Sequence, residues 1–265
     1  CRALKGSMLR QEVYADDADH PGATQEQIQR ARRPYTVTEQ NFTIRTLQAL
    51  DNNRHAVFFT HARESLSYHY ERNPTDPRIQ HALTLEVDDY GNVLKQAAIS
   101  YGRRTSPLAD DWDRKRQTTA LLTYSENRVT NAIESADTHR NPLPCEAVTF
   151  ELTGYTTTGP AGRYQASDFV EPDPATPGRL RHRFTAPEVA YEVTATGNQR
   201  RRPIEQLRTL YRRDDLGSLL PLGELHPLAL PGESYKLAIT PGSLDQVYVR
   251  GSHRLMPANP ASVLA

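Results

Sequence analysis

The sequence predicts a mainly β protein of antiparallel hairpins and meanders, with one or two short helices near its C-terminal end. The first observation is an alternation of apolar and polar residues with a period of two, which places one set of side chains on one face of a strand. This alternation runs through residues 65–101, at Leu66, Tyr68, Tyr70, Ile79, Leu83, Leu85 and Val87. The segment therefore predicts three successive strands.

The second observation is that turn residues separate these strands. The stretch Asn73–Pro77 contains two prolines, whose fixed φ angles and missing N–H groups oppose both strand and helix. The four residues of the next turn are Asp89, Tyr90, Gly91 and Asn92. The glycine and the asparagine tolerate the positive φ that a tight hairpin requires. We expect these four residues to be a structural turn, followed by a third strand at Val93–Tyr101.

The third observation is a polar composition. Hydrophobic residues make up 37% of the 265 residues, against roughly 45–50% in an ordinary globular domain, so we expect the sheet to expose much of its surface. Lys+Arg and Asp+Glu both number 32, and a chain without net charge has no field that favours nucleic acid or an anionic membrane. No apolar run approaches the roughly 18 residues of a membrane-spanning helix.

Further elements follow from the same patterns in chain order. Before residue 65 we expect a strand within residues 1–14, a short helical turn near Gln25–Gln29, and strands at residues 35–46 and 55–60. After residue 104, a charged segment at residues 110–116 precedes expected strands at residues 117–124, 146–155 and 187–194. The arrangement continues the meander.

One convincing helix is predicted at residues 203–214. Pro203 occupies a first helical position, and Gly217 supplies a stop. The residues that recur at helical spacing are Ile204, Leu207, Leu210 and Tyr211. A last short helix is expected after Pro241. The stretch Asn141–Pro144 holds two prolines and predicts a boundary, which divides the chain into a β-meander region at residues 1–140 and a second β-rich region at residues 141–265.

No metal or cofactor site is predicted. Four histidines, His55, His61, His69 and His81, lie in one strand-rich region, but their spacing matches no zinc motif. We expect His81, on an otherwise apolar face, to be hydrogen-bonded within the sheet. Cys1 and Cys145 fit neither a metal motif nor a disulfide framework, and we expect free thiols. Because the chain begins at Cys1 rather than at methionine, we expect it to be part of a longer polypeptide.

Two charged clusters have alternative interpretations. Glu71, Arg72, Asp76 and Arg78 are candidates for a catalytic acid cluster, but opposite charges beside a proline-rich turn more often fix that turn. The arginines between residues 179 and 213 are candidates for nucleic-acid or subunit contact. A nucleic-acid site would interleave aromatic residues and carry net positive charge, so we favour a solvated helix face. Nucleophile and phosphate-loop motifs are absent, and no catalytic residue is predicted.

Three long stretches carry a resemblance to a known family. They read RALKGSMLRQEVYA with PYTVTEQNF, YERNPTDPRIQHALTLEVDDYGNVLKQAAISYGRR, and RTLYRRDDLGSLLPLGELHPLALPGESYKLAITPG. The chain resembles the B component of insecticidal toxin complexes (Tc toxins of the TcdB/TcaC type), in its middle to C-terminal region. The turn at residues 89–92 resembles the hairpin turn of Rhs/YD repeats, although it departs from the strict pattern.

The resemblance implies a non-enzymatic structural role without a cofactor. In that family, the B component and the C component (an Rhs-repeat protein with an effector) build a hollow, curved β-sheet shell that encloses a cytotoxic effector. Flanking regions dock the shell to the pore-forming A component, and the complex is a secreted bacterial toxin, cytoplasmic before release. By resemblance, the present chain is part of the shell wall, and residues 141–265 start the shell segment, without contact with nucleic acid or insertion into a membrane.

Two alternatives remain open. A carbohydrate- or receptor-binding β module of a toxin would need an exposed aromatic cluster, for which Tyr68, Tyr70 and Trp112 are the candidates. A toxin enzyme domain would need a concave site with converging titratable residues. A wall segment would instead show sheet edges that require flanking chain.

Overall fold

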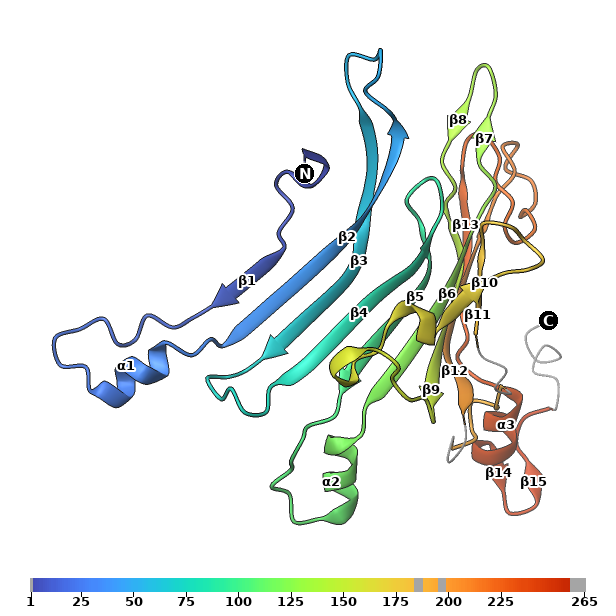
Figure 1. Ribbon diagram of the computed structural model, residues 1–265. Helices are drawn as coiled ribbons and strands as arrows, with labels where there is room; N and C mark the ends of the chain where they lie inside the picture. Colours follow the sequence, from blue (N-terminus) through green and yellow to red (C-terminus); the bar gives the residue numbers. More distant parts are fainter. Residues whose placement is uncertain (1, 184–187, 195–198, 258–265) are drawn as a thin grey trace. The chain divides into compact units, whose positions relative to one another are not determined.

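The structure is a computed structural model that describes residues 2–183, 188–194 and 199–257 (Figure 1). The chain forms two compact units whose segments interleave along the sequence. Unit 1 comprises Cys1–Glu86, Gln96–Leu122 and Gly159–His182. Unit 2 comprises Val87–Lys95, Thr123–Thr158 and Arg183–Ala265. In the part of the chain that the structure describes, no helix is long and apolar enough to cross a membrane.

Unit 1 is an antiparallel meander in which consecutive strands are neighbours. Its strands follow the order β1 (Arg10–Val13), β2 (Thr36–Gln48), β3 (Val57–His69), β4 (Arg78–Val87) and β5 (Val93–Tyr101). The pairs β1–β2, β2–β3 and β3–β4 are antiparallel. Shorter elements are η1 (Arg2–Leu4), α1 (Gln25–Ala31), α2 (Asp111–Thr118), η2 (Pro160–Gly162), η3 (Ala166–Asp168), β10 (Val170–Pro172) and β11 (Leu180–His182). The predicted class, mainly β with antiparallel hairpins, is confirmed.

The alternation in the sequence corresponds to burial in unit 1. Leu66 and Tyr68 on β3 are buried together with Val37 on β2, and Tyr70 and Ile79 pack against them. Val37 and Tyr68 are directly paired across the two strands, so their side chains lie on the same face of the sheet. The period of two therefore identified this face of β3 correctly.

Unit 2 contains the strands β6 (Leu121–Val129), β9 (Pro144–Thr153), β12 (Arg200–Tyr211) and β13 (Pro231–Lys236), in this order. The smaller elements are β7 (Ile133–Glu134), β8 (His139–Arg140), α3 (Pro241–Val247), β14 (Val249–Arg250) and β15 (His253–Arg254). Tyr211, Leu220 and Leu225 form a buried cluster. The Tyr211 hydroxyl donates to the Pro144 carbonyl at 2.9 Å, which ties the end of β12 to the start of β9.

The prediction of a helix at residues 203–214 is wrong, because this segment lies in β12 and the turn that follows it. β12 pairs with β9 on one side and with β13 on the other, so neighbouring strands satisfy its backbone groups. The register shifts between Pro203 and Glu205, and such a bulge accommodates a residue without an N–H. Ile204 and Leu207 are 38% and 40% exposed, so the helical spacing does not mark a buried helix face.

Four other segments named in the sequence analysis can be compared with the structure. The helical turn near Gln25–Gln29 is confirmed as α1, whose Thr24 and Gln27 form a capping box, and the last helix is confirmed as α3. The charged segment at residues 110–116, for which no element was predicted, is mostly helical, and the Asp110 side chain caps α2 by accepting from two backbone N–H groups. The expected strand at 187–194 is wrong for residues 188–194, which contribute an isolated bridge at Glu188; residue 187 lies outside the described residues.

Candidate functional site

The four residues predicted as a structural turn, Asp89, Tyr90, Gly91 and Asn92, connect β4 to β5. Gly91 has a φ of 92°, a left-handed value that a side chain disfavours. The carboxylate of the preceding residue, Asp88, accepts from the backbone N–H of Tyr90 at 2.9 Å and from that of Asn92 at 2.8 Å. This geometry is that of an Asx-type turn.

The side chain of Tyr90 extends the turn toward a second hairpin of unit 2. Its hydroxyl donates to Glu134 on β7 at 2.5 Å, and this hydrogen bond is the main reason why the pKa of Tyr90 is raised. The turn therefore contacts another element through a side chain as well as reversing the chain.

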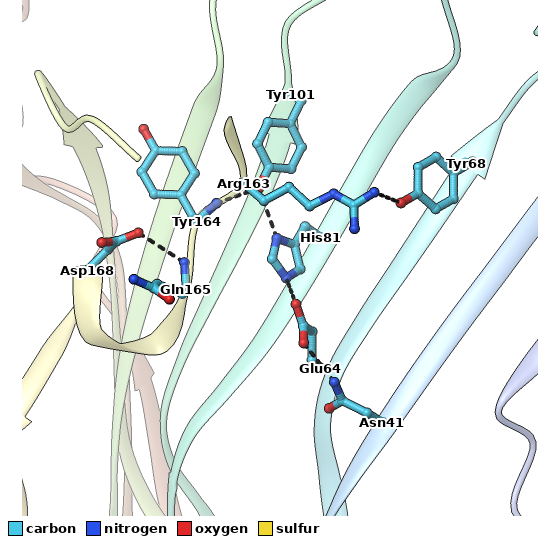
Figure 2. Close-up of polar contacts among 9 residues, drawn as sticks. All are labelled: Asn41, Glu64, Tyr68, His81, Tyr101, Arg163, Tyr164, Gln165 and Asp168. Atoms are coloured by element: carbon cyan, nitrogen blue, oxygen red, sulfur yellow. Dashed lines mark hydrogen bonds and ion pairs between the residues drawn. The ribbon is translucent and has the colours of Figure 1, made fainter. Parts of the chain in front are cut away.

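A connected set of polar side chains lies on the strands of unit 1, and we call it the His81 network (Figure 2). It joins Asn41 on β2, Glu64 on β3, His81 on β4, Tyr101 on β5 and the backbone of Tyr164. The His81 side chain is completely buried, as the expectation of a histidine hydrogen-bonded within the sheet requires. That expectation is confirmed, although the partners belong to other strands.

The partners define the protonation of His81. Its Nε2 lies 2.8 Å from Glu64 Oε1, and a carboxylate can only accept, so Nε2 carries a proton. Burial lowers the pKa of His81, although Glu64 acts in the opposite direction. The neutral ring therefore accepts at Nδ1 from the Tyr101 hydroxyl at 3.0 Å. The same hydroxyl oxygen accepts from the Tyr164 N–H at 2.9 Å, so both His81 nitrogens, the Tyr101 hydroxyl and the Tyr164 N–H have partners.

The network attaches the segment Gly159–Phe169 to the strands of unit 1. Tyr164 and Phe169 are buried, with ring centroids 5.6 Å apart. Arg163 donates a hydrogen bond to the hydroxyl of Tyr68 and lies over its ring. Asp168 accepts from the Gln165 N–H at 2.9 Å. Figure 2 shows Arg163 reaching across toward Tyr68 while Tyr164 meets Tyr101, so two adjacent residues bond to two different strands.

The arrangement suits a structural role, in which the network joins the segment Gly159–Phe169 to the strands, better than a catalytic role. His81, Glu64 and Tyr101 have the residue types of an acid–base relay, but a general base must reach a proton on a substrate. The His81 ring is enclosed, and both of its nitrogens already have partners. Among the described residues, no group of three His, Cys, Asp or Glu side chains could hold a metal ion.

The acidic and basic residues around the proline-rich turn separate into different pairs. Arg78 forms an ion pair with Glu71, and Arg72 pairs with Asp17 at 2.5 Å. Asp76 accepts from the backbone N–H of Arg104 at 3.0 Å. These contacts fix the turn and the neighbouring chain, so the structural interpretation of this cluster fits the geometry.

Seven arginines of residues 179–213 are paired with carboxylates, and the favoured solvated helix face is wrong because the segment contains strands β11 and β12. The ion pairs are Arg179–Glu86, Arg181–Glu171, Arg201–Glu188, Arg202–Glu151, Arg208–Glu146, Arg212–Glu233 and Arg213–Asp215. Glu146 on β9 also accepts from Gln206 at 3.0 Å and from Arg128 at 3.1 Å. Although burial raises it, these donors hold the pKa of Glu146 below its usual value.

The aromatic candidates for a binding module do not form one exposed cluster. Tyr68 is 7% exposed and stacks on Tyr70 with ring centroids 5.8 Å apart. Trp112 is 62% exposed and lies on α2, where Arg116 covers its ring at 4.0 Å. Cys145 is a free, buried thiol whose pKa is raised by burial; Cys1 lies outside the described residues.

Sequence reasoning missed most of the His81 network. It singled out His81 from its position on an apolar face, but Glu64, Tyr101 and Arg163 carried no signal of their own. The Tyr101 and Tyr164 partners lie 63 residues apart in the chain, and no local pattern links them.

Comparisons with known proteins give one family. Residues 1–141 match the sequence model described as insecticide toxin TcdB middle/C-terminal region. The chain is similar to the crystal structure of TcdB2-TccC3-Cdc42, with a TM-score of 0.68 and 24% identity over 99% of this chain and 11% of that one. For the crystal structure of TcdB2-TccC3 without its hypervariable C-terminal region, the TM-score is 0.67, with 24% identity over 99% of this chain and 11% of that one.

A third structure is the Photorhabdus luminescens Tc holotoxin pore, with a TM-score of 0.64 and 24% identity over 94% of this chain and 11% of that one. The present chain therefore spans about a tenth of the length of the solved chains it matches, and the likeness shows a shared fold. The comparison with curated proteins gave no significant match.

Proposed function

The chain belongs to the insecticide toxin TcdB family, in its middle/C-terminal region, and on this premise we propose that it is a non-enzymatic part of the wall of a hollow toxin shell. The family match over residues 1–141 is the observation that carries the proposal. The shell would enclose a cytotoxic effector and deliver it as part of a secreted bacterial toxin complex. The proposal includes no cofactor, no nucleic acid and no insertion into a membrane.

The partners in this proposal are the toxin C component and, through flanking regions, the pore-forming A component. Support comes from the similar structures, whose names describe TcdB2 with TccC3 and a Tc holotoxin pore. The division into residues 1–140 and 141–265, the second starting the shell segment, stays a prediction. The end of the family match at residue 141 supports it. In the same proposal, residues 89–92 serve as one of the hairpin turns of the wall.

The β2–β3 hairpin supports a role within a larger sheet. β1 pairs with β2 at Thr36–Glu39, and β4 pairs with β3 at Glu64–His69. Between these limits, residues 42–62 form a two-stranded ribbon whose outer edges have no paired strand among the described residues (Figure 1). Large apolar side chains on this ribbon and its connecting loop are 38–57% exposed: Ile44, Leu47, Leu50, Val57 and Phe58.

A two-stranded ribbon with unpaired edges and exposed apolar side chains is unusual at the solvent-exposed surface of a folded protein. An isolated two-stranded hairpin is marginally stable in water, and an open edge is a template for another strand. Apolar side chains on both faces would also associate unless something covered them. These properties suit a segment that flanking polypeptide or a partner completes, which is what a wall built from one continuous sheet requires.

The proposal is tested by co-expressing the full-length protein that carries this chain with a C-component partner. We expect a stable complex on size-exclusion chromatography and protection of the partner's C-terminal region from added protease. An effector region cleaved as fast as in the isolated partner would contradict the proposal. It would direct attention to ligand screening for a carbohydrate- or receptor-binding module.

The hairpin gives the same experiment a residue-level version. Phe58→Asp places a charge on the exposed ribbon, and we expect it to lower the yield of the complex. Leu216→Asp adds the same charge at a side chain that is 67% exposed in a turn of unit 2, and it serves as the matched control. Equal yields for the two variants would mean that the ribbon is not covered in the complex.

A further inference from the structure

Unit 1 contains a pocket of about 290 Å³ whose wall is rich in guanidinium groups and phenol rings. The lining residues that matter are Arg10, Glu12, Tyr14, Arg33, Tyr70 and Arg72. They come from β1 and the residue after it, from the turn that follows α1, and from the turn that follows β3. None of them belongs to the His81 network, so this is a separate site.

An unusual backbone conformation places Arg72 in the wall of this pocket. Glu71 and Arg72 have φ values of 50° and 64°, and two consecutive side-chain-bearing residues in the left-handed region are strained. Backbone hydrogen bonds hold the strained turn: the Glu71 N–H donates to the Tyr35 carbonyl at 3.1 Å and the Arg72 N–H to the Pro34 carbonyl at 3.2 Å. Strain of this kind persists where the surrounding structure enforces it, and it concentrates at functional sites.

The guanidinium of Arg72 is buried but not fully satisfied. Its side chain is 6% exposed and donates to Asp17 at 2.5 Å, while the ring of Tyr35 lies 4.8 Å away. Its Nε has no hydrogen-bond partner among the described residues. A guanidinium carries five N–H donors, so pairing with the single carboxylate of Asp17 leaves N–H donors of Arg72 without an acceptor in the described part of the chain.

The other two arginines differ in how strongly they are already paired. Arg10 shares its guanidinium between Glu12 and Glu39. The Arg33 side chain is exposed and forms no hydrogen bond or ion pair with the described residues. Arg33 is therefore the cation of the lining that is available to a new partner.

We propose that this pocket binds a carboxylate group, carried by a small organic acid or by an acidic side chain of a partner polypeptide. Guanidinium forks match a carboxylate in geometry and charge, and the rings of Tyr14 and Tyr70 supply flat apolar contact beside them. The lining holds three arginines and one glutamate, while Glu39 and Asp17 from outside it pair with Arg10 and Arg72, so Arg33 is the cation left to meet a ligand. Because Glu12 would repel a phosphate group with two charges more strongly than a carboxylate group with one, a carboxylate group is the better ligand.

The first arm of the test uses a small acid and does not depend on the shell proposal. Succinate is titrated calorimetrically into the full-length protein, its Arg33→Gln variant and its Arg32→Gln variant. Arg32 is exposed, adjacent in sequence and absent from the lining, so it is the matched control. We expect saturable binding that is weakened about tenfold by Arg33→Gln, the effect of losing one charge-assisted hydrogen bond, and unchanged by Arg32→Gln.

The second arm places the carboxylate on a partner polypeptide. If succinate gives no saturable heat, charge reversal by Arg33→Glu should weaken the complex with the C component about tenfold, while Arg32→Glu leaves it unchanged. If succinate does not bind, the proposal is overturned when Arg33→Glu assembles as the unaltered protein does, and also when no complex forms. Because Arg33 is exposed, neither of its variants removes a buried contact on which folding depends.

Discussion

Removing one oxygen atom, by Tyr101→Phe, tests how much the His81 network stabilises unit 1. The ring of Tyr101 stays in place, stacked on His81 with centroids 6.0 Å apart, so the change opens no large cavity. Only the hydroxyl is lost, and with it the donor to His81 Nδ1 at 3.0 Å and the acceptor for the Tyr164 N–H at 2.9 Å.

The expected magnitude follows from the two groups left without partners. His81 Nδ1 and the Tyr164 N–H belong to residues that are 1% and 5% exposed, so water cannot readily replace the hydroxyl. A buried polar group without a partner costs about 1–3 kcal/mol. The two together predict a decrease of about 2–4 kcal/mol in the free energy of unfolding, since some relaxation around the smaller side chain is expected.

The assay is equilibrium unfolding in urea, followed by far-ultraviolet circular dichroism and analysed by linear extrapolation. Tyr235→Phe is the matched control, because Tyr235 is 50% exposed and its hydroxyl donates to an exposed glutamate; its midpoint should not shift. Hydrogen exchange adds a local measurement, in which the Tyr164 amide loses protection in Tyr101→Phe. A midpoint shift no larger than that of the control would refute the argument that the network is a structural tie.

Three further changes test other parts of the structure. Burial lowers the pKa of His81 below its usual 6.5, so the contribution of the neutral ring to the free energy of unfolding is present above about pH 6.5 and is lost as pH drops through the folded-state pKa. Urea midpoints measured from pH 7.5 to 5.5 should show this loss, and His81→Gln should remove the pH dependence. Gly91→Ala, at a φ of 92°, should cost about 1–2 kcal/mol. Gly22→Ala, where an added Cβ would make only ordinary contacts with the His20 ring, should stay within about 0.5 kcal/mol in the same urea measurement. Glu146→Ala leaves three donors without their acceptor and should lower the free energy of unfolding in urea by about 1–3 kcal/mol. The control Glu205→Ala breaks an exposed ion pair with Lys236 and should cost less than about 1 kcal/mol. Equal costs would contradict the argument that burial makes the Glu146 contacts more stabilising.

The local parts of the fold were predictable from the sequence. The strands and turns of residues 65–101 follow from a period of two and from the special backbone preferences of proline, glycine and asparagine. These are properties of neighbouring residues, and the strands are confirmed as β3, β4 and β5. The family was also predictable, because long stretches specific to it carry far more information than a short motif, and residues 1–141 match it.

The segment around Pro203 shows where local patterns fail. The spacing of Ile204, Leu207 and Tyr211 is compatible with a helix as well as with a strand that contains a bulge. The choice depends on hydrogen-bond partners in β9, where Pro203 lies opposite Phe150. Because a strand is stabilised by neighbours that are distant in the chain, local periodicity alone gave the wrong element.

What the sequence determined by itself was the class of fold, the hairpin turns, the family and the need of His81 for a polar partner. Only the tertiary structure decided which partners His81 has, how Gly159–Phe169 joins the strands, and that Arg72 and Arg33 line one pocket. The physical reason is distance along the chain. Turn geometry and periodicity act between adjacent residues, whereas Arg72 and Asp17 are 55 residues apart, and only strand pairing brings such groups together.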